Sequence, residues 1–177
     1  MMKKVLIILL LINFKLSYAS FILIPMDDVS QTNHLKAYGI TFLSIKQGNK
    51  AKWLLNYEGG SFLLEDNSAI RNECKIRGVA FQVISDVQAE NILIEISSPS
   101  KNMEAVLLEK APKIAVYSPK DKMPWDDAVT MVLTFAEIPF DVIYDEDVLS
   151  EKLLDYDWLH LHHEDFTGQL GKFYGSY

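Results

Sequence analysis

One stretch decides the predicted fold: residues 113–162 read KIAVYSPKDKMPWDDAVTMVLTFAEIPFDVIYDEDVLSEKLLDYDWLHLH. Short apolar runs at 113–117, 140–144 and 158–162 alternate with a helical pattern at 126–137 and a shorter one at 148–154. Apolar runs of this length predict buried strands, and their alternation with helices predicts crossovers between parallel strands. We therefore predict a β-α-β-α-β order for this stretch.

The same alternation is present upstream. We predict extended segments at 21–25, 53–57, 62–64 and 79–84, and helices at 28–38, 68–77, 86–96 and 103–108. Glu58 to Ser61 predicts a tight turn, because this segment lacks the further glycine and lysine of a phosphate loop. The predicted fold class is α/β, with a largely parallel sheet covered by helices on both faces. Polar breakers at 97–100 predict a boundary between residues 20–98 and residues 111–177.

The N-terminus has the pattern of a secretory signal peptide. A basic start, Met1 to Lys4, precedes the apolar run Val5 to Ile12, and small residues precede a cleavage position after Ala19. Asn13 and Lys15 interrupt the run well before the roughly 20 apolar residues that a membrane-spanning helix needs. We predict residues 1–19 as a signal peptide, export to the periplasm or the cell exterior, and no stable membrane span after cleavage.

Charge and cysteine content limit the partners and the chemistry. A formal net charge of -7 disfavours nucleic acid as a partner. Cys74 is the only cysteine of the 177 residues, so an intrachain disulfide is impossible. Its place in a predicted helix favours a buried structural thiol over a nucleophile. The sequence predicts neither a cofactor nor a metal site.

A cluster of ionisable residues follows the last predicted strand. His160 and His162 would share one face of that strand, while His163, Glu164 and Asp165 would lie on the loop at its carboxyl end, where parallel α/β sheets bind ligands. Imidazoles beside carboxylates suit metal binding, general acid-base chemistry or substrate orientation. Core packing of His160 and solvation or helix capping by the others are equally open. We take His162, His163, Glu164 and Asp165 as candidate substrate-binding residues.

Several motifs together resemble an exported bacterial family that is commonly labelled asparagine synthetase B. These motifs are His34 to Gly39, Trp53 to Phe62, Ala111 to Tyr117, Pro124 to Thr130 and Tyr156 to Gln169. The resemblance covers essentially the whole chain after the signal peptide. It implies a class I glutamine-amidotransferase-like fold with flavodoxin-like layering, of which this chain would be the N-terminal portion.

The sequence does not determine which reaction, if any, the protein catalyses. A glutamine-hydrolysing asparagine synthetase needs an N-terminal cysteine after Met1 and a pyrophosphate loop, whereas position 2 is Met and Glu58 to Phe62 has a different pattern. One hypothesis is an amidotransferase-like or hydrolase-like enzyme whose nucleophile lies downstream of Tyr177. The other is a non-catalytic domain that binds a small molecule, peptide or protein, with stacking surface from the aromatic tail residues Phe166, Phe173, Tyr174 and Tyr177. Because no closing helix follows the last strand, we also predict that the fold is incomplete at the C-terminus.

Overall fold

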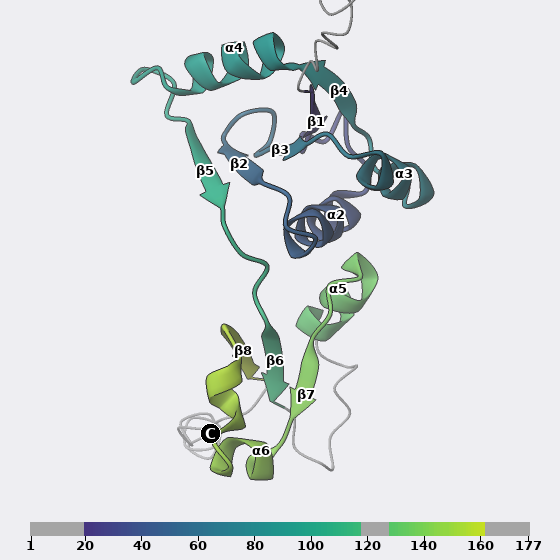
Figure 1. Cartoon of the computed structure of the whole chain (residues 1–177), viewed down its shortest axis with the longest axis vertical. Helices are drawn as coiled ribbons and strands as arrows, with labels where there is room; N and C mark the ends of the chain where they lie inside the picture. Colours follow the sequence, from purple (N-terminus) through teal and green to yellow (C-terminus); the bar gives the residue numbers. More distant parts are fainter. Residues whose placement is uncertain (1–19, 118–127, 162–177) are drawn as a thin grey trace, which may run out of the picture.

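The computed structural model describes residues 20–117 and 128–161. In these residues the strands form two sheets, and the chain finishes the first before it starts the second (Figure 1). Sheet A has five strands in the order β4-β1-β3-β2-β5, and sheet B has three in the order β7-β6-β8. The predicted signal peptide, 1–19, lies outside the described residues.

Sheet A has the arrangement of a ferredoxin-like split β-α-β fold with an addition at one edge. Its elements are β1 (Ser20–Ile24), α2 (His34–Lys46), β2 (Ala51–Leu55), β3 (Phe62–Glu65), α3 (Ser68–Ile76), β4 (Gln82–Ser85), α4 (Asp86–Ile96) and β5 (Glu104–Leu108). All four neighbouring strand pairs are antiparallel. The first four strands with α2 and α3 make the β-α-β-β-α-β motif, and β5 extends it beside β2.

The prediction of a largely parallel sheet is therefore wrong. β1 and β2 do run in the same direction, as do β3 and β4, and the strand, helix and strand predicted within residues 62–84 are present as β3, α3 and β4. However, β3 lies between β1 and β2 and is antiparallel to both. In the same way, β1 lies between β3 and β4 and is antiparallel to both. The alternation of strands and helices gives the direction of consecutive strands but not which strand fills the gap between them.

Two predicted helices also differ from the structure. Residues 103–108 were predicted as a helix, but Glu104–Leu108 is strand β5, in which Val106 pairs with Trp53. A short apolar run cannot be assigned by periodicity alone, and pairing with β2 decides it. Residues 28–38 were predicted as a helix, but α2 begins only at His34. The Asp27 carboxylate accepts hydrogen bonds from the Val29 and Ser30 N–H groups and holds this segment as a turn.

Helices cover both faces of sheet A. Alternate residues of β1 point to opposite faces: Ile22 and Ile24 pack on the side of α2 and α3, while Leu23 packs on the side of α4. The first face buries Ala37 and Ile40 of α2 and Ile70 and Cys74 of α3. The second face buries Ala89 and Ile96 of α4.

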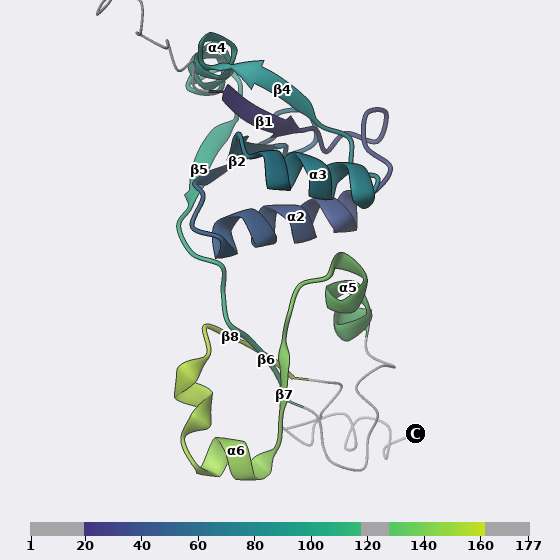
Figure 2. The same ribbon diagram turned by 45° about the vertical axis from the view of Figure 1, so that its right-hand side comes forward.

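Sheet B is the only parallel sheet within the described residues. It comprises β6 (Ile114–Tyr117), α5 (Ala128–Ala136), β7 (Asp141–Ile143), α6 (Asp145–Leu149), the 3-10 helix η2 (Lys152–Asp155) and β8 (Trp158–Leu161). Leu133 of α5 packs on Ile114 and Val116, and α6 with η2 lies on the other side of the strands (Figure 2). The order predicted for residues 113–162 is thus present, in a sheet of three strands.

The two sheets are joined through a close contact of α2 with α5. A Cβ atom added at Gly39 would lie 1.8 Å from the backbone oxygen of Ala136, so only glycine permits this approach. Phe42, one turn further along α2, packs against the core of sheet B. Glu137, directly after α5, accepts hydrogen bonds from Lys36 at 2.7 Å and pairs with Arg77 at 3.0 Å.

The Gly39 contact predicts a specific loss of stability. Gly39→Ala should lower the free energy of unfolding by about 2 to 3 kcal/mol, because overpacking exceeds the gain in helix propensity. Gly48→Ala is the control, since its added methyl group meets nothing within 4 Å and costs only about 1 kcal/mol of left-handed strain at φ +85°. Urea unfolding of both variants measures the difference. An equal or smaller loss for Gly39→Ala would contradict the close contact of the two helices.

Candidate functional site

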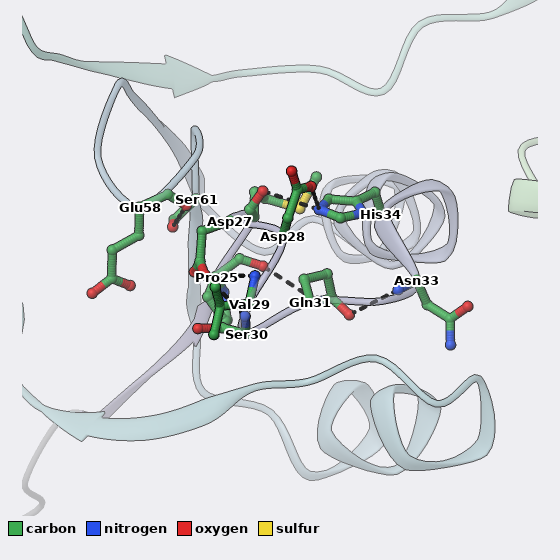
Figure 3. Close-up of polar contacts among 11 residues, drawn as sticks. Pro25, Asp27, Asp28, Val29, Ser30, Gln31, Asn33, His34, Glu58 and Ser61 are labelled. Atoms are coloured by element: carbon green, nitrogen blue, oxygen red, sulfur yellow. Dashed lines mark hydrogen bonds and ion pairs between the residues drawn. The ribbon is translucent and has the colours of Figure 1, made fainter.

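Two edges of the molecule bring polar side chains together. The first is in sheet A, where β1 and β2 run in the same direction, so the loop 25–33 and the turn 56–61 lie at one edge (Figure 3). The Met26 N–H donates to the Glu58 carbonyl at 3.0 Å. Gly59 has φ +76°, and a Cβ there would lie 2.3 Å from the Met26 oxygen, so glycine is required for the turn to contact the loop.

A buried glutamine fixes this loop. The Gln31 side chain is only 1% exposed. Its Nε2 donates to the carbonyls of Pro25 and Ala80, and its Oε1 accepts from the N–H groups of Asn33 and Ala80. Both ends of the amide are thus satisfied, which removes the cost of burying it. The loop is held rigidly against the connection between α3 and β4.

The titratable groups of this first edge are engaged in local structure. Hydrogen bonds from Ser30, and then from Val29, lower the pKa of Asp27. Burial, followed by the nearby charge of Asp27, raises the pKa of Glu58. His34 is the first residue of α2, and its Nε2 lies 3.1 Å from the Met26 oxygen and 3.7 Å from Asp28 Oδ1.

Metal and thiol chemistry gain no support from the described residues. In residues 20–117 and 128–161, no three His, Cys, Asp or Glu side chains are grouped so that they could hold a metal ion. Cys74 is fully buried on α3, and burial raises the pKa of its thiol to about 11. The thiolate is therefore scarce at neutral pH, and the predicted burial of Cys74 is confirmed. Without metal or thiol chemistry, the role that the structure shows for the polar groups of the first edge is to hold loop 25–33 in place.

The second edge lies at the carboxyl ends of the sheet B strands. From β6 the chain passes through α5 to β7 on one side, and then through α6 to β8 on the other side. This reversal makes the β6–β8 edge a topological switch point, where open α/β sheets bind ligands. Tyr117 and Leu161, the last residues of these two strands, pair directly.

A hollow of about 450 Å³ lies at this edge. Leucine and valine side chains form most of its wall, and a tyrosine and a carboxylate contribute polar groups; the lining residues are Tyr117, Asp145, Val148, Leu149, Leu153, Leu159 and Leu161. The Tyr117 hydroxyl donates to Asp145 Oδ1 at 2.5 Å. An apolar cavity of this size with a few convergent polar groups is typical of small-molecule sites.

The candidate site residues predicted from sequence are connected to this edge only by their position in the chain. His162, His163, Glu164 and Asp165 lie outside the described residues and follow Leu161 directly in the chain. His160 is described and half-buried. It pairs with Val116, whose side chain belongs to the core under α5, so His160 alternates away from the hollow.

Sequence reasoning missed Tyr117 and Asp145. The sequence could have indicated both residues, because Tyr117 is the last residue of one predicted strand and Asp145 directly follows another. The pairing of the two side chains depends on β6 and β7 being neighbours, which the sequence alone did not give.

Comparisons with known proteins give no relative for this chain: no family model, no curated protein and no solved structure matches it. The resemblance to the family labelled asparagine synthetase B gains no support from them and stays a prediction from the sequence motifs. None of the helices that the structure describes has the length and apolar character needed to cross a membrane.

Proposed function

We propose that this chain binds a small organic molecule at the carboxyl edge of sheet B. The observation that carries this proposal is the hollow beside the β6–β8 switch point, with its leucine walls and the Tyr117–Asp145 pair. A suitable ligand has an apolar body, which the leucines would remove from water, and a polar group, which would hydrogen-bond to the phenol or the carboxylate.

The exposure of the wall supports a ligand rather than a closed core. Leu149 is 83% exposed and Leu161 46% exposed, although both line the hollow. Removal of apolar surface from water by a bound ligand stabilises the complex by about 25 cal/mol per Å² of buried surface.

Two leucines provide a matched test of the hollow. Leu149 and Leu154 are 83% and 81% exposed, but only Leu149 is among the lining residues. With the fluorescent probe 1-anilinonaphthalene-8-sulfonate, Leu149→Glu should weaken binding about tenfold through lost apolar contact and charge repulsion, whereas Leu154→Glu should change it less than about twofold. Fluorescence titration measures both dissociation constants. Equal effects of the two substitutions, or no binding by the unaltered protein, would contradict the proposal.

We also propose a second candidate function, hydrolysis or transfer of an amide at the same edge. It is supported by chain order, because His162, His163, Glu164 and Asp165 follow directly after Leu161, and Leu161 pairs with Tyr117. Histidine next to carboxylate suits general acid-base chemistry. Because Cys74 is buried and burial raises the pKa of its thiol to about 11, it is not the nucleophile of this reaction.

Ammonia release from glutamine tests this second function. In the full-length protein, joint replacement of His162 and His163 by alanine should lower the rate about 100-fold or more without loss of the circular dichroism spectrum of the fold. His34→Ala is the control, because His34 lies at the edge of sheet A and should leave the rate unchanged. An unchanged rate in the double variant, or no ammonia release by the unaltered protein, would exclude the function.

We also propose that the protein is exported from the cytoplasm. This proposal rests on the basic and apolar pattern of residues 1–19 and the small residues before the cleavage position. N-terminal sequencing of protein recovered from the periplasm or the medium should begin at Ser20. Recovery only from the cytoplasm, with Met1 retained, would contradict it.

A further inference from the structure

A second concave region lies between the two sheets. It is a cleft of about 310 Å³ formed by the C-terminal half of α2, the connection from β5 to β6 and the start of β7. Its main walls are Phe42, Lys46, Pro112, Lys113, Phe140 and Asp141. None of its lining residues belongs to the hollow at the carboxyl edge of sheet B. Clefts between two packed units are frequent ligand sites.

Two lysine ammonium groups, those of Lys46 and Lys113, bring positive charge to the cleft. Within the described residues, neither Lys46 nor Lys113 forms an ion pair, whereas Lys36 and Lys110 pair with Glu137 and Asp157 at 2.7 and 2.6 Å. The Lys113 ammonium lies 4.3 Å from the ring centroid of Tyr156. Hydrogen bonding from Lys110 is the main cause that lowers the pKa of Asp157, and the charge of Lys113 contributes, but neither cleft ammonium forms an ion pair with a described carboxylate. In a protein of net charge -7, two such ammonium groups favour an anion.

One carboxylate also lines the cleft. Asp141 accepts a hydrogen bond from the Tyr156 hydroxyl at 3.0 Å. Two lysines and one aspartate leave the cleft with a net charge of +1. The electrostatic preference is therefore for a ligand with a single negative charge.

The apolar walls are held in place by both sheets. Phe42 from α2 and Phe140 before β7 are half-buried and pack against the core of sheet B. Pro112 and Pro139 have fixed φ angles and limit the motion of the two connecting segments. A flat apolar group between such walls buries its faces with little loss of side-chain entropy.

We propose that this cleft binds a small aromatic carboxylate, whose carboxylate is held by Lys46 and Lys113 and whose ring packs against Phe42 and Phe140. The cleft draws one lysine from the sheet A unit and the other from the connection into sheet B. Its occupant therefore bridges the two units. This site is independent of the ligand proposed for the hollow.

Phenylacetate is the probe for this proposal. Titrated into the full chain at millimolar concentration, it should shift the backbone amide resonances of Phe42, Lys46 and Lys113 in a ¹⁵N-correlation spectrum. Lys46→Gln and Lys113→Gln should each weaken binding about tenfold, the effect of losing one charge-assisted hydrogen bond. Phenylacetamide, which has the same ring without the charge, should bind more weakly than phenylacetate by a similar factor.

Two controls make the result specific. Lys50→Gln removes an exposed lysine that is close in sequence to α2 but does not line the cleft, and it should change the affinity less than about twofold. Leu149→Glu alters the hollow and should leave phenylacetate binding unchanged. No shift at the three amides, equal weakening by Lys50→Gln, loss of binding in Leu149→Glu, or equal affinity for phenylacetamide would each overturn the proposal.

Discussion

The contact on which the structure depends is the approach of Gly39 to the backbone of Ala136. Because position 39 has no side chain, α2 lies directly against α5 and serves two cores at once. Ala37 and Ile40 pack on sheet A, and Phe42 packs on the core of sheet B. Without this approach, Phe42 would not reach Ile114 and Val116, and the cleft beside it would have only one wall.

Ion pairs accompany this packing but do not determine it. Glu137 joins Lys36 of α2 to Arg77 at the end of α3, and the Lys36 ammonium also lies 4.7 Å from the Phe135 ring centroid. Hydrogen bonding from Lys36, with the charge of Arg77, lowers the pKa of Glu137. The carboxylate is about half exposed, and exposed pairs contribute little because water screens them. The pairs favour one alignment of the helices, while the buried contacts hold the helices together.

Local sequence signals predicted the elements well and their arrangement poorly. The α4 bounds, Asp86 to Ile96, were predicted correctly, because caps and apolar periodicity are local. The insertion of β3 between β1 and β2 depends on contacts far apart in sequence. The same reason explains which part of the candidate site could be predicted. The strand ends in the sequence predicted the carboxyl edge of sheet B, but the Tyr117–Asp145 pair could be found only from the order of the strands.

The cleft beside Phe42 requires that the two sheets form one rigid body, since a cleft between units and a fixed α2–α5 contact exist only if the units keep their relative orientation. Residual dipolar couplings of the backbone amides test this most directly. In one alignment medium, the amides of β1–β5 and those of β6–β8 should fit a single alignment tensor. Two tensors of different orientation or magnitude would show that the units move independently and would contradict the contact at Gly39.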